Sequence, residues 1–127
     1  MLQAKDLRIG NYIADKWIGG NIPFKITSIG KTTCTYKSIR GFRCGYGSLQ
    51  PIPLTEEILK NNFGFKKIYK IGNKKYFEHS EYRISFTVVD NCFVFDFGPT
   101  TIGQREYVHE VQNLFKELTQ KEIEINL

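Results

Sequence analysis

The sequence predicts an α+β protein: a small, SH3-like β-barrel unit, a short helix, and an antiparallel sheet packed by a C-terminal amphipathic helix. Short β-branched runs separated by glycines fill the first half, and alternating apolar strands follow the short helix. An apolar stripe with helical spacing then stands near the C-terminus. We expect a β-rich basic unit over residues 1–54 and a helix–four-strand–helix unit over residues 55–127, together forming one folding unit.

The first half reads as short strands joined by turns. Pro23–Ile29 is the first long run, and Gly30-Lys31 turns the chain into the β-branched run Thr32–Tyr36, which should pair back on it. The glycines at 41, 45 and 47 divide the segment that follows. Several short strands with glycine turns in about fifty residues are typical of a small, SH3-like barrel.

A short helix should begin after Leu54. Thr55 can cap the first free amides, and Glu56 and Glu57 lie where the helix dipole favours negative charge. Gly64 is placed to end the helix in a left-handed conformation.

Four strands should form the sheet of the second half. The loops between paired strands are Gly72-Asn73 and Asp90-Asn91, whose residue types tolerate a positive φ. The predicted strands are Phe65–Ile71, Lys74–Glu78, Tyr82–Val89 and Cys92–Phe97.

The last helix has the clearest pattern in the chain. Its apolar stripe consists of Tyr107, Val108, Val111, Leu114, Phe115 and Leu118. Thr101 and Gln104 form a predicted capping box before it. The alternation in Ile123–Leu127 predicts an edge strand after it.

Positive charge is concentrated in the first half. The chain carries a net charge of +5, and residues 1–54 hold eight basic and two acidic side chains. No acidic residue lies between Asp15 and Glu56, and aromatic residues stand among the cations. Such a surface attracts polyanions, and its rings can stack on bases.

These residues define the predicted ligand-binding surface. Its basic and aromatic members are Lys16, Trp17, Tyr36, Lys37, Arg40, Phe42, Arg43 and Tyr46. The lysines between residues 66 and 75 extend the positive field. The loop Gly98–Arg105 adds Thr100, Thr101 and Arg105, because helix N-termini bind phosphate and a helix is expected to begin there.

No pattern in the chain predicts a catalytic, metal or cofactor site. Gly30-Lys31-Thr32 lacks the earlier glycine of a phosphate-binding loop, and no GxSxG elbow accompanies His79-Ser80. The three cysteines and two histidines show no metal-ligand spacing. We therefore predict a protein that is not an enzyme and that needs no cofactor or metal.

One polar face of the last helix has two interpretations. His109, Gln112, Asn113 and Lys116 share it. It is either a structural face, which is solvated or has its histidine hydrogen-bonded to a neighbouring strand, or a surface for a partner.

The first residues of the chain and its cysteines indicate the cellular compartment of the protein. The opening MLQAKDLRIGN has no apolar core typical of a signal peptide, and no apolar run has the length of a membrane span. An odd number of cysteines without CxxC spacing is typical of reduced thiols, which predicts a cytoplasmic protein.

Three segments resemble a known family. They are LRIGNYI (Leu7–Ile13), IPLTEEILKNNFGF (Ile52–Phe65) and YVHEVQNLFKELTQKEIEI (Tyr107–Ile125). The chain resembles small uncharacterised proteins of phages and prophages of gut Bacteroidetes, which usually have a glycine where Gln120 stands and often a leucine where Val111 stands. The resemblance implies a phage accessory protein in the cytoplasm of a bacterial host, and it carries over no catalytic residues.

These observations predict a non-catalytic protein that binds an anionic, base-containing ligand. The ligand is either nucleic acid or a nucleotide second messenger that a phage sequesters against host defence. The alternative is a protein–protein interaction module that docks on an acidic host or phage protein, or an oligomer formed through the C-terminal strand or the His109 face. A hydrolase would require a titrating group in a cleft, and the sequence indicates none.

Overall fold

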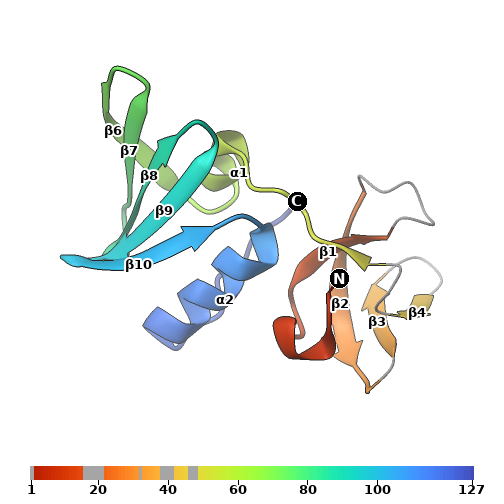
Figure 1. Cartoon of the computed structure of the whole chain (residues 1–127). Coiled ribbons are helices and arrows are strands. Elements are labelled where there is room, and N and C mark those ends of the chain that lie inside the picture. Colours follow the sequence, from red (N-terminus) through yellow and green to blue (C-terminus); the bar gives the residue numbers. More distant parts are fainter. Residues whose placement is uncertain (1, 16–21, 32, 38–41, 46–48) are drawn as a thin grey trace. The chain divides into compact units, whose positions relative to one another are not determined.

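The computed structural model describes residues 2–15, 22–31, 33–37, 42–45 and 49–127 (Figure 1). The predicted α+β class is confirmed, because the chain forms two antiparallel sheets and a C-terminal helix. Its internal contacts divide it into two compact units. Unit 1 comprises Met1–Pro53 and Tyr107–Asn113, and unit 2 comprises Leu54–Glu106 and Leu114–Leu127.

Unit 1 is built on a five-stranded antiparallel sheet with the order β4-β3-β2-β1-β5. The last strand, β5, therefore returns to pair with the first. The elements are the 3-10 helix η1 (Ala4–Asp6), β1 (Tyr12–Asp15), β2 (Pro23–Ile29), β3 (Thr33–Lys37), β4 (Phe42–Gly45) and β5 (Leu49–Gln50).

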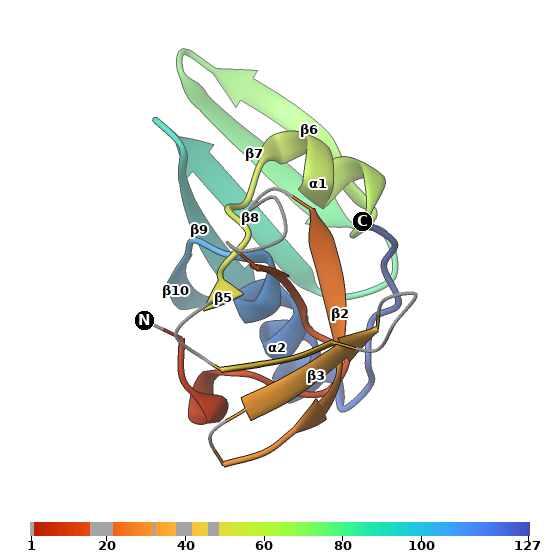
Figure 2. The ribbon, with the colours of Figure 1, turned by 90° about the vertical axis from the view of Figure 1, so that its right-hand side faces the viewer.

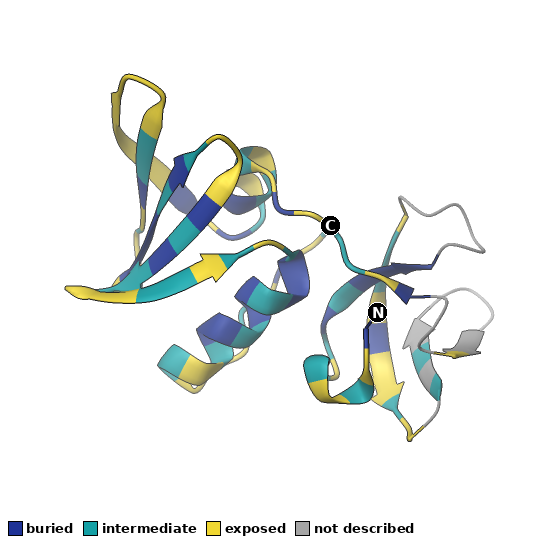
Figure 3. Cartoon of the chain, viewed as in Figure 1, coloured by how far each residue is buried: buried dark blue, intermediate teal, exposed yellow. Residues whose placement is uncertain are grey.

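The predicted pairing of the first two long strands is confirmed. β2 and β3 are antiparallel neighbours, with a register shift between Ile26 and Ser28. The Gly30 amide donates to the Thr33 carbonyl at 2.8 Å, which closes the turn between the strands. The core of this unit is aliphatic, and its buried members are Leu2, Leu7, Ile13, Ile26 and Leu49 (Figure 3). Closure of the sheet into an SH3-like barrel stays a prediction.

Unit 2 contains a five-stranded antiparallel meander with the order β10-β9-β8-β7-β6. Hence β6 and β10 are its two edges. The elements that begin in this unit are α1 (Glu56–Asn61), β6 (Phe65–Ile71), β7 (Lys74–His79), β8 (Ile84–Val89), β9 (Cys92–Phe97) and β10 (Thr100–Arg105). The C-terminal helix, α2 (Val108–Thr119), has its first residues in unit 1 and its last in unit 2.

Both predicted hairpin loops are confirmed. Gly72 has a φ of 61°, and Asp90 and Asn91 have φ values of 51° and 62°. The two successive positive φ values of Asp90 and Asn91 give that loop a backbone twist that matches the twist of the flanking strands. The predicted bounds of β6 and β9 are also those observed, whereas β7 extends to His79 and β8 begins only at Ile84.

The predicted start of α1 is confirmed. The Thr55 hydroxyl accepts a hydrogen bond from the Ile58 amide at 3.1 Å, as an N-cap should. Gly64, just beyond the helix, has the predicted left-handed φ, at 85°. α1 lies beside β6 (Figure 2).

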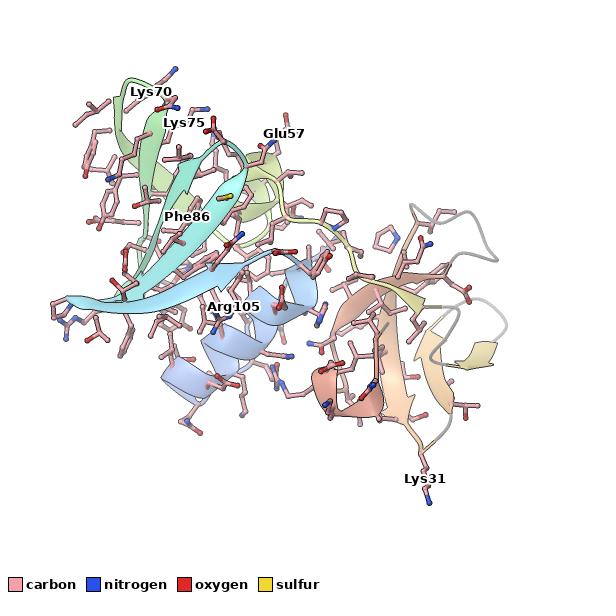
Figure 4. All side chains as sticks on the ribbon, viewed as in Figure 1. Lys31, Glu57, Lys70, Lys75, Phe86 and Arg105 are labelled. Carbon is pink, nitrogen blue, oxygen red and sulfur yellow. The ribbon has the colours of Figure 1, made fainter. Side chains whose placement is uncertain are left out.

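The core of unit 2 is aromatic. Phe65 packs against Phe86, Phe95 and Phe115, with ring centroids 4.9 to 6.3 Å apart. Phe86 lies on the sheet face that turns toward α2 (Figure 4). The predicted stripe of α2 is confirmed at Val108, Val111, Leu114 and Phe115, which are all buried.

The predicted loop and capping box before α2 are wrong. Thr100–Arg105 form the edge strand β10, which pairs with β9 with a register shift between Thr101 and Gly103, and the helix begins only at Val108. The physical reason is local: Gly98, with a φ of 57°, turns the chain directly after β9. The β-branched residues that follow then suit a strand.

The predicted C-terminal edge strand is also wrong. Residues 122–127 contain no strand, although Ile125 is buried. The Asn126 carbonyl accepts a hydrogen bond from the side chain of Asn62 rather than from a strand amide. At the end of α2, Gln120 has a φ of 62°, the left-handed conformation that glycine adopts most easily.

Candidate anion-binding surface

The β6–β7 hairpin carries the densest run of positive charge in unit 2. Between Phe65 and His79 the chain has five lysines and a single acidic residue, Glu78. Four of the lysines are exposed, and within the described part of the chain none of these four forms an ion pair. The exposed lysines are Lys66, Lys67, Lys70 and Lys74.

The fifth lysine, Lys75, is neutralised by α1. Its Nζ lies 2.9 and 3.1 Å from the two carboxylate oxygens of Glu56 (Figure 4 labels Lys75). The side chains of the pair are 30% and 34% exposed, so its contribution to stability is small. Lys75 is therefore less available to an anion than the other four lysines.

A β-bulge in β6 changes which residues reach each face of the sheet. Lys67 lies opposite Phe77, but Tyr69 lies opposite Tyr76, so that Ile68 is the extra residue. Without the bulge, Lys67 and Tyr69 would share one face. With it, Lys67 lies on the face of the buried Phe77, whereas Tyr69, opposite Tyr76, lies on the other face.

Tyr69 and Tyr76 stack on each other across the two strands. Their ring centroids are 5.1 Å apart, and the ring planes differ by 19°. Tyr69 is 46% exposed, whereas Tyr76 is half-buried and donates a hydrogen bond to Glu78 at 3.1 Å. The pKa of Tyr76 is raised: a hydrogen bond with Ser85 lowers it, but burial and Glu78 together raise it more. Its phenol therefore keeps its proton at neutral pH.

The register also assigns each lysine of the hairpin to a face. Lys66 lies opposite Glu78, and Lys74 lies opposite Ile71. Alternation along each strand then places Lys66 and Lys74 on the face of the tyrosine stack. Lys67 and Lys70 belong to the other face, which carries Phe77. We call the face with Lys66, Tyr69, Ile71, Lys74 and Tyr76 the open face of the hairpin.

A pocket of about 290 Å³ adjoins the open face. Tyr76, Glu78, Ser85 and Arg83 are among its lining residues. Hydroxyl groups, a carboxylate and a guanidinium meet there, and such groups suit a polar ligand rather than an apolar one. A second pocket, of about 340 Å³, has Glu81, Glu122 and Glu124 in its lining, so its charge does not suit an anion.

His79 lines both pockets, but its ring is already engaged. Its Nδ1 accepts a hydrogen bond from the Glu81 amide at 3.1 Å, so the proton resides on Nε2, which donates to the Phe63 carbonyl at 2.7 Å. The ring also contacts Phe65, Tyr82 and Phe115. His79 thus orients the segment after α1, and neither ring nitrogen is left for catalysis.

The predicted surface of the first half is described only in part. Tyr36 and Lys37 lie in β3, Phe42 and Arg43 lie in β4, and Tyr36 is the direct partner of Phe42 in the ladder. The other four predicted residues, Lys16, Trp17, Arg40 and Tyr46, lie outside the described residues.

Thr100, Thr101 and Arg105 lie on β10, not at a helix N-terminus. Arg105 donates to the Gln104 carbonyl at 2.9 Å (Figure 4 labels Arg105). The premise for phosphate binding by this segment, free amides at a helix start, is therefore wrong. A role of the three side chains in ligand binding stays a prediction.

The polar face of α2 is not a solvated face. Gln112 is 3% exposed, accepts from the Tyr12 amide at 2.8 Å and donates to the Gly10 carbonyl at 3.0 Å. Asn113 accepts from Arg8 and Asn11. These side chains hold the helix within unit 1, so they are structural and not open to a partner.

The tyrosine stack was not predicted, although the length of the hairpin loop in the sequence indicates which residues pair across the two strands. A two-residue loop at Gly72-Asn73 pairs Ile71 with Lys74, and continued counting pairs Tyr69 with Tyr76. No residue pattern in the sequence predicts the bulge at Ile68.

Comparison of the chain with protein-family models, curated proteins and solved structures gave no match. Among the described residues, no group of three or more His, Cys, Asp or Glu side chains could hold a metal ion. In the same residues, no helix is both long and apolar enough to cross a membrane.

Proposed function

We propose that this protein is a non-catalytic binding protein for an anionic, base-containing ligand, and that the β6–β7 hairpin forms a contact surface for that ligand. The exposed lysines of the hairpin carry this proposal: Lys66, Lys67, Lys70 and Lys74 lie within nine residues and have no ion-pair partner among the described residues. A cluster of one sign attracts the opposite charge and raises its local concentration.

The length of the hairpin favours a nucleic-acid strand over a single nucleotide. The seven residues of β6 span roughly 23 Å at the usual rise of a strand. A strip of that length can contact several consecutive phosphates. In unit 1, Lys37 of β3 and Arg43 of β4 stay proposed contacts of such a ligand.

A nucleotide second messenger is the other ligand of this class. The resemblance to phage proteins motivates it, because a phage protein in the cytoplasm of a bacterial host can counter defence by sequestering such a messenger. In unit 1 we propose an SH3-like arrangement. The return of β5 to β1 after the four-strand meander β1–β4 supports it.

A protein-interaction module is the second candidate function. It is favoured by the exposed apolar residues of the edge strand β6: Ile68 is 51% exposed and Ile71 is 70% exposed. An unpaired edge can accept an extended segment of a partner, and the lysines would select an acidic one.

Fluorescence anisotropy with a labelled oligonucleotide, measured over a range of salt concentrations, tests the first proposal. The variant Lys66→Gln/Lys67→Gln/Lys70→Gln/Lys74→Gln should lose most of the affinity. The double variant Lys116→Gln/Lys121→Gln, which removes charge elsewhere in unit 2, should bind nearly as well as the original protein. Absence of binding by the original protein to any oligonucleotide or cyclic dinucleotide at low salt would reject the proposal and favour the protein-interaction module.

A further inference from the structure

The tyrosine stack ends at an open edge. β6 is the outermost strand of its sheet, so Tyr69 has Tyr76 on one side and, among the residues that the structure describes, no further strand on the other. One face of the Tyr69 ring is thus covered by a second ring, while the side chain as a whole remains 46% exposed. A flat aromatic group could extend this stack by one member.

The surroundings of Tyr69 suit a nucleobase. Ile71, two residues further along the same strand and on the same face, is 70% exposed, and Ile68 of the bulge is 51% exposed. Apolar side chains beside an exposed ring favour a flat, weakly hydrated group over an ion. Stacking of a base on an aromatic ring is also tolerant of sequence, because every base has a π-face.

Cations lie along the strands on both sides of the stack. On the open face, Lys66 precedes Tyr69 along β6, and Lys74 lies opposite Ile71 beyond the stack. The order along the hairpin is therefore cation, ring pair, cation. A single strand alternates in the same way, because each base is joined to a phosphate on either side.

We infer that the ligand of the open face is single-stranded nucleic acid, one unpaired base of which stacks on the outer face of Tyr69 while Lys66 and Lys74 contact the flanking phosphates. This inference rests on the proposed function and narrows it. A duplex offers its phosphates but keeps its bases stacked on one another, so it cannot use the ring. The bulge at Ile68 has a role in this arrangement, because it places Lys66 on the same face as Tyr69.

The test compares a labelled single strand, a duplex of the same sequence and inorganic polyphosphate as a competitor without bases. Tyr69→Ala should weaken single-strand binding at least fivefold, the loss expected when one base–ring stack is removed. Tyr69→Phe, which keeps the ring, should bind as the original protein does. Lys66→Gln/Lys74→Gln should bind less tightly than Lys67→Gln/Lys70→Gln, which removes the same charge from the other face of the hairpin.

The outcomes distinguish a failure of this inference from a failure of the proposed function on which it rests. Equal affinity for duplex and single strand, together with unchanged binding by Tyr69→Ala, would overturn the inference and leave a hairpin that binds phosphate backbones. Competition by polyphosphate as strong as that by oligonucleotide would overturn it in the same way. Absence of binding to all three would reject the proposed function as well. Circular dichroism of Tyr69→Ala and Tyr69→Phe checks that both variants keep the native sheet.

Discussion

Asn11 and Asn113 are joined by a side-chain hydrogen bond of 2.9 Å, although 102 positions separate them in the chain. The same Asn113 oxygen accepts a second hydrogen bond from Arg8 Nε at 2.8 Å, and its amide nitrogen donates to the Asp6 carbonyl at 3.2 Å. One side chain therefore ties the first turn of unit 1 to the helical segment that completes this unit.

Replacement of Asn113 by alanine should cost about 2 kcal/mol of unfolding free energy. The substitution removes the acceptor of Arg8 Nε and of the Asn11 amide, and the donor to the Asp6 carbonyl, in a part-buried site. Each lost hydrogen bond costs roughly 1–3 kcal/mol less whatever water and the remaining contacts of Arg8 recover. Urea unfolding measures the loss. Glu117→Ala, at an exposed position of the same helix, is the control and should change stability by less than about 0.5 kcal/mol. Equal stabilities of the two variants would show that the network contributes nothing.

Acidification should destabilise the protein through His109. Burial lowers the pKa of His109 below its ordinary value of 6.5, although Glu110 and Asp6 act in the opposite direction. The unfolded chain therefore binds this proton more readily than the folded one. The contribution of the neutral ring is complete above about pH 6.5, and it is lost as the pH falls through the lower pKa of the folded state.

The measurement is urea unfolding at several pH values between 7.5 and 5.5, an interval that includes the ordinary histidine pKa of 6.5 and extends below it. His109→Gln removes the titrating group, so its unfolding free energy should fall less steeply over the interval than that of the original protein. A variant as sensitive to pH as the original protein would assign the acid sensitivity to other groups.

Removal of the charge of Glu56 should strengthen binding of nucleic acid. Glu56→Gln releases Lys75 from its ion pair and adds a fifth available cation to the hairpin. The slope of log affinity against log salt for a single strand should steepen by about 0.7, the change expected for one additional phosphate contact. Glu57→Gln makes the same change of charge one residue later, at an exposed position without an ion pair among the described residues, and is the matched control. Identical salt slopes of the two variants would argue against a role of Lys75.

Local patterns were enough to predict two hairpins and the short helix α1. The loops Gly72-Asn73 and Asp90-Asn91 carry residue types that tolerate a positive φ, and the predicted bounds of β6 and β9 are those observed. Thr55 similarly signalled its own role as a cap. In each case, residues that are neighbours in the sequence determine which local backbone conformation has the lower free energy.

A long-range partner decided the position of Gln112. Its side chain is polar and was expected on a surface, but its partners are backbone groups of Tyr12 and Gly10, about a hundred residues away. Thr100–Arg105 was missed for a local reason, because Gly98 turns the chain directly after β9 and the following residues pair with that strand. Ile123–Leu127 has a strand pattern but forms no strand in the structure.

In the candidate site, too, some features can be predicted from the sequence and others cannot. The lysines of the hairpin can be read directly from the sequence, and the tyrosine stack follows from the loop length once the register is counted. The bulge at Ile68 cannot be counted in this way, because its cost is offset by packing elsewhere in the sheet. The faces on which Lys66 and Lys67 lie were therefore beyond the sequence.

The exposed edge strand β6 also affects the solubility of the protein at high concentration. Ile68 and Ile71 would make this edge a template for pairing with another copy, and the lysines beside them keep like-charged edges apart. The same cations would thus act as gatekeepers against aggregation. Acetylation of these lysines, or their replacement by neutral residues, should lower the solubility of the native protein, so a binding assay on such variants needs a check of particle size by light scattering.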